Sequence, residues 1–313
     1  MRTEVLKEKE VVQKAKKQVK EQANKASVRE AQKTTGRVHA QGAMKLHKED
    51  TTDPMKDPNV QPDPRTEHVP DPKQQKIKGK PFIKGEGDKD EVEMNDVRQG
   101  RLGDCYFVAS LAALAKTDPE LIKSRVKDNG DGTYTVLFFE GGAVVVDNTF
   151  PTDASGEPVY ASPDDRSSEG VELWVMLIEK AWAKLKGGYE QIRGSKVRMK
   201  SKDAMEAVSG RKTRVVYLSS GSKDTIFATI SAALQKGAAV TAGTRAKNEL
   251  SVEEWGKARK LGIYANHMYA VVSVDVNKGE IHLYNPWGAE YKVSPLSAED
   301  FVKYYDHVNL NMK

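Results

Sequence analysis

Four residues of this 313-residue chain have types and an order that suit nucleophilic catalysis by a thiol: Gln99, Cys105, His267 and Asn285. Cys105 is the single cysteine of the sequence, and it opens a predicted helix. The positive end of a helix dipole favours the thiolate, which is the nucleophilic form of cysteine. The chemistry that this arrangement predicts is attack of the thiolate on a carbonyl carbon, assisted by a nearby base.

Histidine is the side chain best suited to be that base, because it can accept and return a proton near neutral pH. Of the six histidines, four lie in polar segments that we do not expect to be held rigidly. These four are His39, His47, His68 and His307. His267 begins an apolar strand directly after a loop, whereas His282 has the context of an ordinary strand residue. His267 is therefore the predicted base.

The other two candidate residues would support the thiol and the imidazole. His267 and Asn285 lie on the two arms of a predicted hairpin that turns near residue 278. An asparagine carbonyl that accepts a hydrogen bond from the imidazole would fix the ring, and Trp287 would shield that bond from water. Gln99 lies six positions before Cys105, where its amide could complete an oxyanion hole with the Cys105 N–H.

The elements that position these residues follow residue 94. Residues 105–116 are apolar on nearly every side and predict a buried central helix. Residues 171–186 predict a second helix, with Trp174 in its apolar stripe and with Glu172 and Glu179 turned mostly away from it. A hairpin with its turn at Gly-Gly is expected between these helices. Beyond residue 210 the chain is richer in strands, which are expected at 213–218, 238–244, 267–276 and 280–287, with a helix at 224–235.

The first 93 residues differ in composition from the rest. Of the 4 Trp, 11 Tyr and 7 Phe, only Phe82 precedes residue 96, so this region cannot build much of a core. Seven of the 13 prolines lie within residues 51–81, where they favour extended chain. We interpret 1–49 as a charged tail, helical or disordered, and 50–93 as a proline-rich linker.

Several classes of protein are excluded or disfavoured by composition. The longest apolar runs are much shorter than the roughly 20 residues of a membrane span, and the N-terminus lacks the apolar segment of a signal peptide. One cysteine excludes disulfide frameworks and cysteine-rich zinc modules. A net charge of +5 argues against nucleic acid as the main partner. We expect neither a nucleic acid nor a membrane partner, and a protein that is cytoplasmic or secreted without a cleavable signal peptide.

Four separate blocks of the sequence resemble the catalytic core of calpain-type cysteine proteases, over about residues 94–305. The blocks are QGRLGDCYF from residue 99, LWVMLIEKAWAKL from residue 173, NHMYAV from residue 266 and NPWG from residue 285. Each block alone would be a weak signal, but the four occur in the family's order with compatible spacing.

This resemblance implies an α+β fold of the papain-like type with two lobes. Residues 94–209 would form a mainly helical lobe with the cysteine, and 210–313 a β-rich lobe with the histidine and asparagine. It also implies a Cys-His-Asn triad of Cys105, His267 and Asn285 that cleaves protein or peptide substrates through an acyl-enzyme, with Gln99 assisting the oxyanion. The predicted function is a calpain-like cysteine endopeptidase.

The chain departs from the family pattern at several points. Tyr106 replaces the usual Trp after the cysteine, and Asn266 replaces the common Gly before the histidine. The short hairpin between His267 and Asn285 is typical of a trimmed, microbial member of the family.

Calcium is the cofactor that the family implies. Asp96 and Glu179 resemble carboxylate positions of its first calcium site, and oxygen ligands suit this ion. However, the acidic loop expected for the second site is reduced to Glu290. We therefore expect that no cofactor is required, that calcium binding is possible, and that any calcium dependence is weak.

Two alternatives to the endopeptidase remain open at this point. One is another papain-like activity, such as an amidase on cell-wall peptides or a transglutaminase. The other is a catalytically silent binding module. The charged N-terminal region could address a secretion machine, as in a bacterial effector, or occlude the cleft as a propeptide.

Overall fold

The computed structural model describes residues 72–313 except 86, 164–165, 168–169 and 195–196. The described residues all belong to one compact unit of the chain. The predicted tail 1–49 and the first part of the predicted linker lie outside the described residues. Within the described part, the helices lack the combination of length and apolar character that crossing a bilayer requires.

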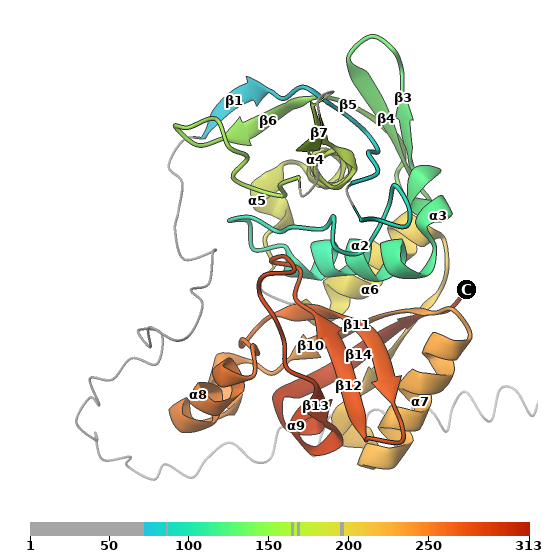
Figure 1. Ribbon diagram of the computed structural model, residues 1–313, viewed down its shortest axis with the longest axis vertical. Coiled ribbons are helices and arrows are strands. Elements are labelled where there is room, and N and C mark those ends of the chain that lie inside the picture. Colours follow the sequence, from blue (N-terminus) through green and yellow to red (C-terminus); the bar gives the residue numbers. More distant parts are fainter. Residues whose placement is uncertain (1–71, 86, 164–165, 168–169, 195–196) are drawn as a thin grey trace, which may run out of the picture. The chain divides into compact units, whose positions relative to one another are not determined.

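In the described residues, the first lobe consists of helices and three small sheets, and α2 and α6 lie on the side that faces the second lobe (Figure 1). Its helices are α2 (Cys105–Thr117), α3 (Pro119–Lys123), α4 (Trp174–Lys186), α5 (Tyr189–Ile192) and α6 (Val197–Ser209). Its sheets are β3 (Val126–Asp128) with β4 (Thr133–Phe138) and β5 (Gly142–Asp147), β1 (Lys73–Lys76) with β6 (Thr149–Thr152), and β2 (Gly79–Lys80) with β8 (Gly170–Glu172) and β7 (Arg166–Ser167). The central helix α2 is buried from its first residue to Ala115, as its all-round apolar sequence predicts.

The folded part begins earlier than the linker prediction 50–93 implies. β1 pairs antiparallel with β6, and β2 pairs parallel with β8. All four residues of β1 are exposed, so this strand is held by backbone hydrogen bonds and has no apolar pattern that the sequence could reveal. Residues 72–93 therefore belong to the first lobe, although their composition resembles that of the preceding segment.

The second lobe is built on a six-stranded antiparallel sheet in the order β13-β12-β11-β10-β14-β9. Its strands are β9 (Thr213–Tyr217), β10 (Ala239–Thr244), β11 (Met268–Asp275), β12 (Glu280–Tyr284), β13 (Leu296–Ser297) and β14 (Tyr305–Asn311). Its helices are α7 (Lys223–Gln235), α8 (Val252–Lys260) and α9 (Ala298–Tyr304). The predicted hairpin of residues 267–287 is formed by β11 and β12.

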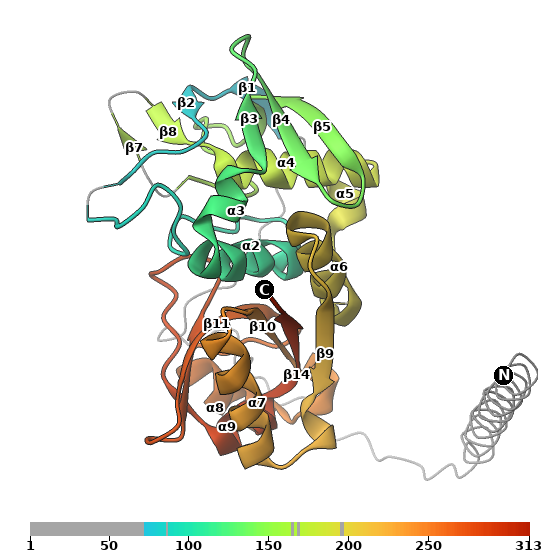
Figure 2. The same ribbon diagram turned by 90° about the vertical axis from the view of Figure 1, so that its right-hand side faces the viewer.

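The sheet serves two hydrophobic cores at once, because successive side chains of a strand point to opposite faces. Ala239, Ala270 and Tyr284 pack in the core of the first lobe, which contains α2 and α6. Val240 and Val271 pack in the other core, with residues of α7 and α9. Figure 2 shows β10 and β11 between these groups of helices. The fold is α+β, and α2 is packed directly on the strand that follows His267.

Candidate active site

The candidate nucleophile lies where the helical lobe meets the sheet. Cys105 is the first residue of α2 and is 2% exposed. It forms a small buried cluster with Ala109, one turn later in the helix, and with Met268. Met268 is the first residue of β11 and follows His267 in sequence. Packing of this helix start against this strand start brings the cysteine and histidine segments together.

The imidazole of His267 is held from three sides. Its Nε2 lies 2.9 Å from Asn285 Oδ1, and both residues are buried. The Trp287 ring lies over the imidazole with centroids 4.5 Å apart, and the Tyr269 ring meets it edge-on at 4.8 Å. Trp287 therefore packs against the imidazole that makes this hydrogen bond, and its shielding of the bond from water stays a prediction.

The orientation of the Asn285 amide sets the tautomer of the histidine. The backbone N–H of Trp287 donates to Asn285 Oδ1 at 3.1 Å, which identifies this atom as the amide oxygen. Nε2 of His267 must then carry the hydrogen of the 2.9 Å bond. In the neutral ring, Nδ1 is left as the basic nitrogen, which is the atom that a general base needs.

The backbone at His267 is fixed by a threonine that the sequence analysis did not single out. His267 N–H donates to Thr244 Oγ1 at 2.9 Å, and the Thr244 hydroxyl lies within hydrogen-bond distance of two carbonyls, at 2.8 and 3.0 Å. The preceding residue, Asn266, has a φ of 54°. This left-handed conformation is one that Asn tolerates better than other residues with a Cβ, which explains how Asn can replace the family's usual Gly.

We expect Asn266→Ala to lower the free energy of unfolding by about 1 kcal/mol, because alanine is disfavoured at positive φ. Asn266→Gly should change it by only a few tenths of a kcal/mol. Urea denaturation followed by circular dichroism measures both variants. Asn277→Ala, at an exposed turn position without positive φ, is the matched control. Equal effects at positions 266 and 277 would contradict the strain argument.

Gln99 is buried beside the segment that follows Asn285. Its backbone N–H donates to Pro286 O at 2.7 Å. Its side-chain Nε2 donates to Leu102 O at 2.6 Å and reaches Asp104 Oδ1 at 3.4 Å. The Gln99 side-chain amide is thus held by contacts within its own loop. For the predicted oxyanion contact, the same NH₂ group would have to reach the substrate.

Two further contacts tie the loop before the cysteine to the loop after Asn285. The Tyr284 hydroxyl donates to Val97 O at 2.8 Å, and the Arg98 guanidinium forms an ion pair with Glu290. These contacts cross from the first lobe to the second, so both sides of the candidate site are joined at residues that flank its functional side chains.

The two carboxylates predicted for calcium have separate protein partners. Asp96 Oδ2 accepts from the backbone of Glu93 at 2.6 Å and from Trp174 Nε1 at 3.2 Å. Glu179 accepts from the backbone N–H of Ala161. In the part of the chain that the structure describes, no group of three or more His, Cys, Asp or Glu side chains is arranged to hold a metal.

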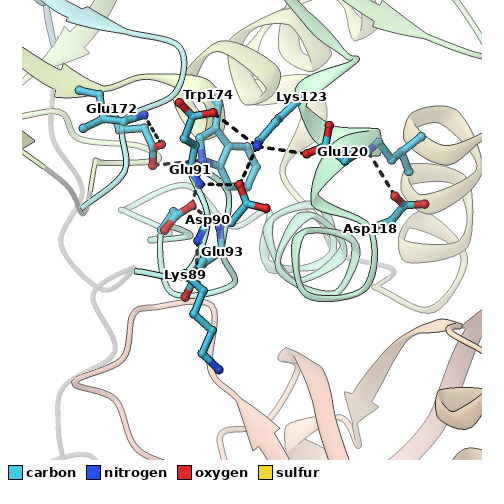
Figure 3. Close-up of polar contacts among 12 residues, drawn as sticks. Lys89, Asp90, Glu91, Glu93, Asp118, Glu120, Lys123, Glu172 and Trp174 are labelled. Carbon is cyan, nitrogen blue, oxygen red and sulfur yellow. Dashed lines mark hydrogen bonds and ion pairs between the residues drawn. The ribbon is translucent and has the colours of Figure 1, made fainter. Parts of the chain in front are cut away.

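The segment that leads to Asp96 is fastened to the first lobe by polar contacts (Figure 3). Lys123 on α3 forms ion pairs with Asp90 at 2.6 Å and with Glu91 at 3.4 Å.

Glu172 accepts from the indole of Trp174 at 3.1 Å. Glu172 is 3% exposed, so the prediction that it turns away from the core is wrong. The carboxylate can be buried because it accepts hydrogen bonds from the Trp174 indole and from the backbone N–H of Ile83.

Glu179 is also buried, at 2% exposure, contrary to the prediction from its helix pattern. Asp104, the residue before the cysteine, is buried as well, and the two carboxyl groups interact electrostatically. Burial raises the pKa of Asp104 to about 7, and it raises the pKa of Glu179 well above its usual value, with the Asp104 charge adding to the effect. The Asp104 side chain makes no helix-capping bond, so it does not serve as a cap.

Comparison with known proteins identifies a protein family whose model covers the candidate site. The model of the calpain family of cysteine proteases matches residues 75–310. The chain is 32% identical over 217 residues to the calpain-type cysteine protease DEK1 of Zea mays, covering 64% of this chain and 9% of that protein. It is 31% identical over 234 residues to calpain-5 of Caenorhabditis elegans, covering 62% and 34%.

A vertebrate relative, calpain-9 of Mus musculus, is 30% identical over 207 residues, covering 62% of this chain and 28% of that protein. The chain thus spans between a tenth and a third of the length of these curated relatives. The family match, by contrast, extends over most of the chain and includes all four candidate residues. The chain belongs to the calpain family of cysteine proteases.

Proposed function

We propose that this protein is a cysteine endopeptidase that cleaves internal peptide bonds of proteins or peptides with a triad of Cys105, His267 and Asn285. The observation that carries the proposal is the 2.9 Å contact between His267 Nε2 and Asn285 Oδ1, formed at the start of the strand that packs against the cysteine. A buried imidazole with one nitrogen fixed by an amide oxygen is suited to serve a neighbouring thiol.

The proposed reaction has two halves. His267 Nδ1 takes the proton of the Cys105 thiol. The thiolate attacks the carbonyl carbon of the scissile bond, and the oxyanion that forms is stabilised by the Cys105 N–H and the Gln99 amide. His267 Nδ1 donates this proton to the leaving amine, the C–N bond breaks, and a thioester to Cys105 remains. His267 then takes a proton from water, whose oxygen attacks the thioester. Collapse of the second oxyanion breaks the C–S bond, releases the carboxylic acid, and leaves a thiolate that regains its proton from His267.

Isotope labelling tests this reaction against its alternatives. Casein is incubated with the protein in H₂¹⁸O together with a primary amine, and the products are analysed by mass spectrometry. An endopeptidase cleaves casein at internal peptide bonds, and each new C-terminal carboxylate carries ¹⁸O. A transglutaminase would attach the amine without new termini, and an amidase on cell-wall peptides would leave casein intact. Absence of any covalent change, together with a Cys105 no more reactive than a free thiol, would favour a binding module.

Removal of calcium provides a separate prediction. Asp96 and Glu179 accept hydrogen bonds from different protein groups, which supports the expectation that no ion is needed to join them. We expect a chelator to change the cleavage rate by less than about twofold, since no essential ligand is removed. Peptide hydrolysis is measured in EDTA and again after excess Ca²⁺. Complete loss in EDTA with recovery in Ca²⁺ would show that the expectation is wrong.

A further inference from the structure

A network of buried polar side chains crosses from the helical lobe to the sheet. Its four members are each 0% exposed: Ser110 on α2, Ser201 on α6, Thr241 on β10 and Asn309 on β14. Successive members lie within hydrogen-bond distance, at 3.0 Å between the two serine Oγ atoms, 2.9 Å from Ser201 Oγ to Thr241 Oγ1, and 3.1 Å from Thr241 Oγ1 to Asn309 Nδ2. We refer to these four residues as the interlobe network. The reaction described above leaves it without a role.

The direction of every hydrogen bond in the interlobe network follows from its last acceptor. Ser110 Oγ donates to Tyr106 O at 2.7 Å, and a carbonyl oxygen can only accept. Because a hydroxyl has one hydrogen, Ser201 must donate to Ser110, and Thr241 must then donate to Ser201. Thr241 is left to accept from the Asn309 amide nitrogen. The network is therefore one continuous series of donors that ends on the main chain of the first turn of α2.

The two sides of the interlobe network lie close to the two halves of the candidate site. Ser110 is five residues after Cys105 on α2, which is about 7.5 Å along the helix axis. Thr241 pairs with Ala270, which is three residues after His267 in the chain, or about 10 Å along the strand. A shift of α2 relative to the sheet would therefore change the separation of the thiol and the imidazole.

The contact of α2 with the sheet also includes small apolar side chains (Figure 1). Ala109 packs with Met268 in one buried cluster, and Ala112 and Ala270 belong to a common hydrophobic core. Hydrophobic contacts have no preferred direction, so they resist a small sliding of α2 only weakly. A hydrogen bond weakens steeply when its length or angle is changed. The interlobe network thus adds positional information that these apolar contacts lack.

Stability alone does not account for a network of this kind. When both partners of a buried hydrogen bond are replaced by apolar groups of the same shape, the stability of a protein often changes little. Fully bonded polar networks contribute something else, because they make a core rigid and specify one arrangement of its elements. In this protein the elements so arranged are the helix that begins with Cys105 and the sheet that carries the His267 hairpin.

We propose that the three hydroxyl residues of the interlobe network, Ser110, Ser201 and Thr241, are positioning residues of the active site. Their hydrogen bonds fix α2 on β10, and they thereby fix the thiol of Cys105 relative to the imidazole of His267. This inference rests on the proposed peptidase function. Loss of the network should slow every step that needs the thiol and the imidazole together, while the fold and substrate binding are retained.

The double variant Ser201→Ala/Thr241→Val tests the inference, because it removes the middle of the network and nearly keeps its volume. We expect kcat for peptide cleavage to fall on the order of tenfold, with KM changed less than about threefold, since a small misplacement of reacting groups lowers kcat strongly. Alkylation of Cys105 by iodoacetamide at neutral pH should slow about threefold, because a displaced imidazole stabilises the thiolate less. If the double variant does not fold, Ser201→Ala alone replaces it, with the same directions expected.

Two further measurements separate positioning from general damage. Thr241→Ser keeps the hydroxyl and loses only a methyl group, so it should keep kcat within about twofold of wild type. The double variant is also made in the His267→Ala background, where no imidazole is left to align. There it should not slow alkylation further, because two changes that act through the same contact are not additive.

The matched control is Ser209→Ala, at a second buried serine of α6. Ser209 Oγ donates to Met205 O at 2.6 Å and accepts from the backbone N–H of Arg211 at 3.0 Å, so its contacts stay at the end of this helix. Its loss should lower the thermal stability and leave kcat and alkylation within about twofold of wild type.

Three outcomes would overturn the inference. They are a folded double variant with kcat within twofold of wild type, a Thr241→Ser variant as impaired as the double variant, and an equal slowing of alkylation with and without His267. Cleavage that Cys105→Ala retains would instead refute the proposed function. If the wild-type protein cleaved no peptide, the proposed function would also be refuted, and the alkylation rates alone would decide whether the network aligns the thiol and the imidazole.

Discussion

Cys105→Ala should abolish peptide cleavage, with kcat/KM reduced on the order of 10⁴-fold or more, because no other side chain can form the thioester. The chain contains no second cysteine that could substitute. The methyl group of alanine occupies less space than the thiol in the small cluster with Ala109 and Met268, so the fold should be retained. Cleavage of casein and of a fluorogenic peptide measures the activity, and circular dichroism measures the fold.

Thr117→Ala, at the other end of α2, is the control for this variant. Its hydroxyl donates to Ala113 O at 2.9 Å, far from the first turn of the helix. We expect its activity to stay within about twofold of wild type, as is usual for a change away from the reacting groups. Cleavage that persists in Cys105→Ala would mean that another group is the nucleophile, and the site assignment would be abandoned.

His267→Ala should reduce kcat/KM on the order of 10³- to 10⁴-fold, since both the base and the proton donor to the leaving amine are lost. It should also slow the alkylation of Cys105 at neutral pH by about tenfold, because an imidazolium that stabilises the thiolate is absent. Both rates are measured on the same preparation.

His282→Ala provides the comparison for the histidine. His282 lies on β12, is partly exposed, and is 3.9 Å from Glu280, so it belongs to the same hairpin as His267. Its replacement should alter neither cleavage nor alkylation by more than about twofold. If the two histidine variants behaved alike, the hairpin and not the imidazole of His267 would be responsible for the loss.

The residues of the proposed triad could be nominated from the sequence because each lies at a recognisable element boundary. Cys105 opens an apolar helix, His267 precedes an apolar strand, and a short hairpin of known length brings Asn285 back to it. These signals are local, or they connect segments through one turn. The α+β class and the main helices are predictable for the same reason.

The partners of the buried carboxylates could not be predicted. Glu172 and Glu179 occupy positions on or before α4 where helical periodicity indicates a polar side, and in the protein they accept hydrogen bonds from Trp174 and Ala161. Periodicity reports which residues share a face, not what covers it. Such contacts join segments that are distant in sequence, and no pattern within either segment records them.

The strand β1 illustrates a second limit. Its residues, KQQK, are polar and exposed, and its pairing with β6 depends on main-chain groups that every sequence possesses. The role of Thr244 could not be predicted either. Its hydroxyl fixes the backbone of His267, but its sequence neighbours do not distinguish it from other strand threonines. Composition could therefore place the start of the folded region only approximately.

The position of β14 constrains how this protein can be made. β14 follows every other strand of its sheet in sequence, yet it lies between β10 and β9. While a ribosome is still short of residue 305, β10 has an open edge and the His267 hairpin beside it lacks its full support. The sheet that supports the His267 hairpin is therefore complete only after residues 305–311 have been synthesised.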